Sequence, residues 1–107
     1  MSWFNEKLPE TEKAFAKMRE SLFKDSALDT KTKELIAVAS STLMRCEFCT
    51  KVHAERAIQQ GATKEQIAEA VGVAMFVASG SQIFWNNVYE EILGDSDAPD
   101  EKCSCCK

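Results

Sequence analysis

Two cysteines and the single histidine of this chain fall within eight consecutive residues, as Cys46, Cys49 and His53. Two thiols separated by two residues can close a disulfide or share a metal ion. On a helix, Cys49 and His53 lie roughly 40° apart around the axis and about 6 Å apart along it. A base at that distance favours the thiolate, which is the form of cysteine that attacks other molecules. The three residues therefore predict redox chemistry.

Two other interpretations of this segment stay open. Free cysteines are among the residues most often buried in a core, where they do no chemistry. Zinc is the main chemical rival, although a structural zinc site takes four ligands and the segment offers three. A fourth would have to come from the C-terminal tail.

The tail, residues 95–107, is acidic, is expected to be flexible, and contains Cys103, Cys105 and Cys106. Soft thiolates favour zinc, copper(I) or thiophilic metalloids, so these three residues are candidate metal ligands. They could also exchange disulfides with the first pair of cysteines, or be inert.

Length and composition indicate one globular domain. The chain has 107 residues, of which 45% are hydrophobic and 28% charged, and a chain this short gains stability from subunit association. Its net charge of −4 argues against a general nucleic-acid binder. The most apolar stretch, 71–78, is too short to span a bilayer, and the N-terminus lacks the pattern of a signal peptide. We therefore expect a cytoplasmic protein whose partners include neither nucleic acid nor membrane.

Helical periodicity in every long segment predicts an all-α domain over residues 1–94, a compact bundle of about five helices. Each of the five predicted helices carries a recognisable start or stop signal. The predicted boundaries are a start at Pro9, an N-cap at Asp29, an end at Gly61 for the helix with the cysteines, a capping box at Thr63, a break or bend at Gly80, and a final stop at Gly94.

The helix that follows Thr63 is apolar on nearly all sides. Val73, Phe76 and Val77 add apolar groups outside its main hydrophobic face. A helix of this kind is buried on several faces, either between other helices or between subunits. We expect these three residues to make contacts within or between subunits.

Local pattern does not single out Glu34, which lies beside an apolar stripe where most glutamates are solvated. A longer pattern includes it: a glutamate, twelve residues to the first cysteine, three to the second and four to the histidine, followed by the segment 61–70. In this order and spacing, residues 28–80 resemble the alkyl hydroperoxidase D-like proteins. Those proteins belong to the carboxymuconolactone decarboxylase superfamily.

The resemblance implies an all-helical fold that assembles as a homo-oligomer, typically a trimer or a hexamer. It also implies roles for four residues. Cys49 would act on the peroxide, Cys46 would resolve the product as a redox-active disulfide, and His53 with Glu34 would form a proton relay. No further cofactor would be required. The expected partners are a peroxide substrate and an external dithiol reductant.

One position departs from the pattern. The hydroperoxidase has a histidine immediately before the second cysteine, where this chain has Phe48. The decarboxylase branch generally lacks the cysteine pair, so lactone decarboxylation is not expected. Our leading hypothesis is an enzyme of the alkyl hydroperoxide reductase type, a thiol-dependent peroxidase or disulfide reductase. The competing hypothesis is a module that binds a metal or metalloid through its thiols without catalysis.

Overall fold

The computed structural model describes residues 2–94, and the regular secondary structure in this part of the chain is all helical. The predicted tail at 95–107, with its cysteine cluster, lies outside the described residues. The all-α prediction is confirmed, with six helices instead of five in the described part. They are α1 (Ser2–Lys7), α2 (Pro9–Leu22), α3 (Thr30–Leu43), α4 (Glu47–Gln59), α5 (Lys64–Ile83) and α6 (Asn86–Leu93).

The helix starts follow the signals in the sequence. Pro9 occupies the first turn of α2, where its missing N–H costs nothing. Asp29 caps α3, and its carboxylate accepts a hydrogen bond of 2.7 Å from the backbone N–H of Thr32. Thr63 and Gln66 form the predicted capping box at the start of α5.

The predicted break at Gly80 is wrong, because α5 continues through this glycine to Ile83. A single glycine costs a helix only about 1 kcal/mol relative to alanine, which is too little to end a helix by itself. The chain bends later, after Ile83, where the axes of α5 and α6 differ by 44°. Gly61, by contrast, follows α4 as predicted, with a φ of 95° that glycine adopts readily.

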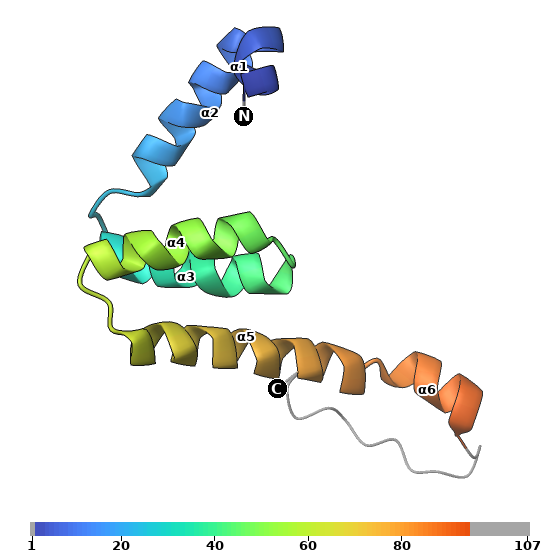
Figure 1. The fold of residues 1–107 in the computed structure, drawn as a ribbon. Helices are drawn as coiled ribbons and strands as arrows, with labels where there is room; N and C mark the ends of the chain where they lie inside the picture. The colour runs from blue at the N-terminus through green and yellow to red at the C-terminus, as the bar shows by residue number, and fades with distance from the viewer. Residues whose placement is uncertain (1, 95–107) are drawn as a thin grey trace.

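Helices α3, α4 and α5 pack against one another, and α1 packs against α2. Figure 1 shows α3 and α4 as an antiparallel pair, with α2 leading away on one side and α5 running along the other. The molecule measures 59 × 36 × 25 Å, and its radius of gyration of 19.3 Å exceeds the value of about 13 Å for a compact chain of this length. The compact bundle that we expected is therefore limited to α3–α5.

The buried apolar core of the described residues is correspondingly small. It consists of Val38, Ala57, Ala62 and Ala74. Phe76 lies on the face of α5 opposite the buried Ala74 and is 74% exposed. Val73 and Val77 are also exposed. Contacts within residues 2–94 leave more than half of each of these side chains exposed, and the predicted contacts between subunits stay a prediction.

Within residues 2–94, no single helix combines the length and the apolar composition needed to cross a membrane. Helices α5 and α6 meet that requirement only when they are taken together across their bend, by length and composition alone.

Candidate functional site

The candidate site lies on the hairpin formed by α3 and α4. A tight turn joins the two helices, in which Arg45 adopts a left-handed φ of 58° and the N–H of Cys46 donates to the carbonyl of Ser41 at 3.0 Å. Val38 on α3 and Ala57 on α4 are completely buried where the helices meet. This packing brings side chains from α3 directly against α4.

Glu34 and His53, which are 19 positions apart in the sequence, form a hydrogen-bonded pair across this hairpin. The distance from Nδ1 of His53 to Oε2 of Glu34 is 2.6 Å, and the Glu34 side chain is only 3% exposed. A buried carboxylate needs such a partner, because leaving it unpaired would cost several kcal/mol, of order 3 or more. When Nδ1–H donates to Glu34, Nε2 is left as the basic nitrogen of the ring.

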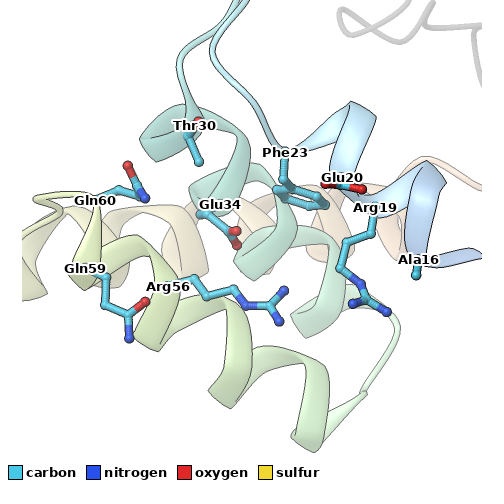
Figure 2. Close-up of a pocket in the computed structure, with 9 residues that line it drawn as sticks. All are labelled: Ala16, Arg19, Glu20, Phe23, Thr30, Glu34, Arg56, Gln59 and Gln60. Carbon is cyan, nitrogen blue, oxygen red and sulfur yellow. The ribbon is translucent and has the colours of Figure 1, made fainter.

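Phe23 is a third member of the site that the sequence did not indicate. It follows the last residue of α2, and its ring stacks on the His53 imidazole, with centroids 5.4 Å apart and planes 20° apart. The stacking fixes the ring plane of His53 from the side of α2. Because Phe23 falls just beyond the periodic stripe of its helix, no local signal marks it. Figure 2 shows Phe23 beside Glu34 in the wall of an open pocket of about 480 Å³.

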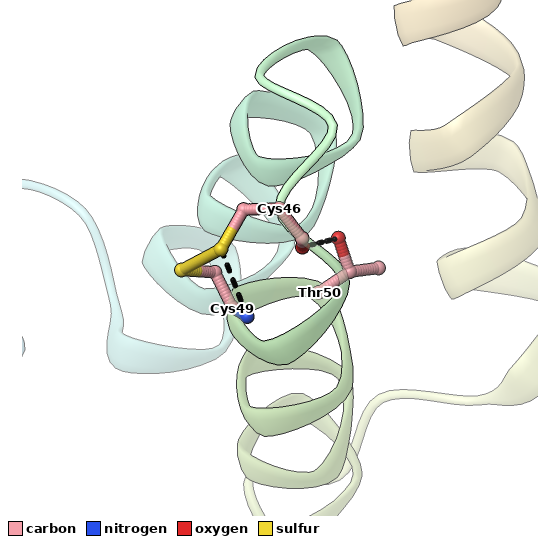
Figure 3. The surroundings of a disulfide bond; sticks show 3 residues. All are labelled: Cys46, Cys49 and Thr50. Carbon is pink, nitrogen blue, oxygen red and sulfur yellow. Dashed lines mark hydrogen bonds between the residues drawn. A yellow bond between two sulfur atoms is a disulfide. The ribbon is translucent and has the colours of Figure 1, made fainter. Parts of the chain in front are cut away.

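The two cysteines lie at the start of α4 (Figure 3) and are joined as a disulfide, with Cα atoms 5.3 Å apart. Cys46 was predicted within a helical stretch but is instead the N-cap of α4. Its Sγ accepts a hydrogen bond of 3.3 Å from the backbone N–H of Cys49, and its carbonyl accepts one of 2.8 Å from the hydroxyl of Thr50. The partial positive charge of a helix start stabilises a thiolate, and Cys46 is the sulfur placed to use it.

His53 lies one turn beyond Cys49 on the same helix, so the regular geometry of α4 places the base about 6 Å along the axis from this cysteine. Both cysteines are half-buried, which leaves them accessible to small molecules. Phe48, the position of the departure, is 76% exposed and presents an apolar ring at the surface beside the disulfide.

The structure thus brings Glu34 and His53 into contact and joins Cys46 to Cys49. No group of three or more histidine, cysteine or acidic side chains within residues 2–94 is arranged to hold a metal ion. The three tail cysteines that we considered as metal ligands lie outside the described residues.

Comparison with known proteins identifies the class of protein that this fold and site define. Residues 9–86 match the carboxymuconolactone decarboxylase family, and because the match covers most of the chain, the protein belongs to that family. A solved structure from Methanobacterium thermoautotrophicum is 38% identical, with a TM-score of 0.73, and the match covers 84% of this chain and 98% of that one. A Thermotoga maritima protein of the same family, described as possibly involved in antioxidative response, is 37% identical with a TM-score of 0.59; the match covers 63% of this chain and 69% of that one.

Among curated relatives, uncharacterized protein 4 in the cox locus of Paracoccus denitrificans is 38% identical over 84 residues, or 78% of this chain and 76% of that protein. The alkyl hydroperoxide reductase AhpD of Corynebacterium kroppenstedtii is 37% identical over 65 residues, or 61% of this chain. This chain spans only 37% of the length of that reductase. The relatives therefore connect the chain, at the level of the family, to the alkyl hydroperoxide reductase AhpD.

Proposed function

We propose that this protein is a thiol-dependent peroxidase in which Cys49 reacts with a hydroperoxide. The observation that carries the proposal is the buried Glu34–His53 hydrogen bond one helical turn from a cysteine pair that lies at disulfide distance. A carboxylate that orients an imidazole beside a thiol is the arrangement that activates a cysteine nucleophile.

The reaction begins with the reduced protein. His53 takes the thiol proton of Cys49, and the thiolate attacks the peroxide oxygen that ends in hydrogen, so that the O–O bond breaks. Cys49 is oxidised to a sulfenic acid, and the leaving alkoxide receives the proton from His53 as an alcohol. Glu34 holds the imidazole in place and stabilises its charged form while it carries the proton.

Cys46 then attacks the sulfenic sulfur, water leaves, and the Cys46–Cys49 disulfide forms. An external dithiol restores both thiols and is itself oxidised to a disulfide. Cys46 is the better point of attack for that dithiol, because Cys49 then leaves as the thiolate one helical turn from His53, whose protonated form stabilises it. Because Cys46 and Cys49 are only half-buried, the reduced pair could also reduce a small disulfide, which is the second candidate activity.

A stoichiometric titration tests the proposal. Reduced protein with Cys103, Cys105 and Cys106 changed to serine, which leaves only the core pair, is treated with one equivalent of tert-butyl hydroperoxide. We expect both remaining thiols to disappear, the alcohol to form, and peptide mapping to find Cys46 joined to Cys49. Thiols that survive a full equivalent of peroxide would rule out the peroxidase mechanism.

A parallel measurement on a second sample separates catalysis from metal binding. Metal analysis of the complete chain, purified without added metal, would favour the binding module if it found stoichiometric metal and no peroxide-driven loss of the core thiols.

A further inference from the structure

The pocket beside Glu34 is lined by two arginines that the proposed mechanism does not use. Arg19 comes from α2 and Arg56 from α4, and Figure 2 shows both guanidinium groups turned toward the same part of the pocket. Among the described residues, no carboxylate forms an ion pair with either arginine. The Arg19 guanidinium instead lies over the Phe15 ring, 5.5 Å from its centroid.

Two carboxylates also line the pocket, and they must be counted. Glu34 is already hydrogen-bonded to His53, so its carboxylate interacts mainly with the imidazole. Glu20 is exposed on α2 and forms no ion pair within the described residues. When His53 is protonated, the Glu34–His53 pair is neutral as a whole. The charged side chains that remain in the pocket lining are then Arg19, Arg56 and Glu20, and their sum is positive. The amides of Gln59 and Gln60 add neutral donors to the same lining.

The pocket lies on the same face of α4 as the reactive cysteine, although neither Cys49 nor His53 lines it. Cys49, His53, Arg56 and Gln60 are spaced by four, three and four residues, which places them on a single stripe of a helix. Arg56 lies about 10 Å along the axis from Cys49. Phe23 connects the two ends, because it stacks on His53 and also lines the pocket, and so provides an apolar wall between them.

We propose that this pocket binds the carboxylate of an organic hydroperoxide acid, so that the alkyl chain lies along Phe23 and the peroxide reaches Cys49. The inference rests on the proposed function and specifies its substrate class. Planar guanidinium groups bind carboxylates through paired hydrogen bonds, and their charge would hold the acid end while the other end reacts. The product would be the corresponding hydroxy acid, released with its carboxylate intact.

Kinetics with a matched substrate pair test the site. The rate of dithiothreitol-dependent consumption is measured for ω-hydroperoxyoctanoic acid and for its methyl ester, which lacks the charge. We expect the wild-type kcat/KM to favour the acid by about tenfold or more, since a charge-assisted hydrogen bond is lost with the ester. Arg56→Gln and Arg19→Gln should each lower this ratio, and the double variant should bring it close to one. Lys17→Gln removes a charge from α2 outside the pocket and should keep the wild-type ratio.

Two results would overturn the inference. The first is a wild-type ratio of kcat/KM for the acid to kcat/KM for the ester near one. The second is an equal loss of kcat/KM with acid and ester in the double variant, which would mean that the arginines only support the fold. If the wild-type protein consumes no hydroperoxide, the proposed function fails and calorimetry decides the site separately. Octanoate should bind the oxidised wild-type protein about tenfold more tightly than methyl octanoate, and the double variant should lose that preference. Absence of octanoate binding would refute the site itself.

Discussion

The α3–α4 hairpin and the α5–α6 arm are both helical and adjacent in the chain, but they differ in what stabilises them. The hairpin buries Val38 and Ala57 and satisfies the buried Glu34 carboxylate with His53. The arm leaves large apolar side chains in solvent, among them Phe76 at 74% and Leu93 at 79% exposure. The hairpin pairs its buried polar groups within one chain, whereas the described residues leave these apolar side chains of the arm uncovered.

We infer that copies of the chain cover the α5–α6 arm, as a homo-oligomer that we expect to be a trimer or a hexamer. Exposed apolar surface of this extent marks an association site in proteins that remain in solution. If this comparison is right, changes in the hairpin should remove chemistry without altering assembly, and changes in the arm should do the reverse.

The largest effect should come from the thiol itself. Cys49→Ser should reduce dithiol-dependent peroxide consumption to the background rate, because a serine hydroxyl does not ionise or accept the peroxide oxygen under these conditions. Cys46→Ser, with the three tail cysteines also changed to serine and no dithiol present, should stop after one equivalent of peroxide, with a sulfenic acid at Cys49 that dimedone traps. Light scattering should give the wild-type mass for both variants. Full turnover in Cys49→Ser would refute the assignment.

The proton relay should have the next largest effect. His53→Gln should lower kcat/KM by about a hundredfold, the usual contribution of a positioned acid–base group. In the proposed mechanism Glu34 positions His53, so Glu34→Gln should lower kcat/KM less than His53→Gln does, and Glu34→Asp should recover part of the loss.

The pH profile distinguishes a relay from a merely structural role for these residues. Activity of both relay variants should recover as the pH rises toward about 8.5, where an unassisted thiol ionises. An equal loss at every pH would indicate that the pair only supports the fold.

The arm provides the reciprocal test. Phe76→Glu should convert the oligomer to smaller species, because each interface would lose about 1.5–3 kcal/mol of apolar burial and gain a charge. Ser79→Glu introduces the same charge at an exposed polar position of α5 and should lower the mass of the oligomer less than Phe76→Glu does. Light scattering at micromolar concentration, with reductant present, measures both. A stable wild-type species near 11.9 kDa would contradict the inferred assembly.

The same comparison explains which features the sequence could predict. The starts of α3 and α5 were predictable because Asp29 and Thr63 interact with residues only three positions away. Cys46, Cys49 and His53 were found because their spacing is local, whereas Glu34 was identified only by resemblance. Its contact with His53 depends on how α3 and α4 pack.

Tertiary contacts account for the features that the sequence did not indicate. Phe23 reaches the site from another helix, and Arg19 and Arg56 share a pocket although they are far apart in the chain. The expectation of one compact bundle failed for a related reason. Periodicity shows that the helix after Thr63 has several apolar faces, but it does not show whether the same chain covers them.

The smallest predicted effect compares the two helix caps. Thr63→Ala should lower the free energy of unfolding by about 1 kcal/mol at any pH, because the lost cap is uncharged. Asp29→Ala should also destabilise the protein, but in a way that depends on pH. Hydrogen bonding from the side chain and backbone of Thr32 lowers the pKa of Asp29. A carboxylate with a lowered folded-state pKa contributes stability above its unfolded value of about 3.9 and loses it as the pH falls through the folded value.

The difference in stability between wild type and Asp29→Ala should therefore shrink as the pH is lowered from about 7 toward about 3, whereas the difference for Thr63→Ala should stay constant. Urea unfolding at one protein concentration measures both, since the concentration must be fixed if unfolding is coupled to dissociation. Parallel pH curves for wild type and Asp29→Ala would show that the charge of Asp29 does not contribute to the cap.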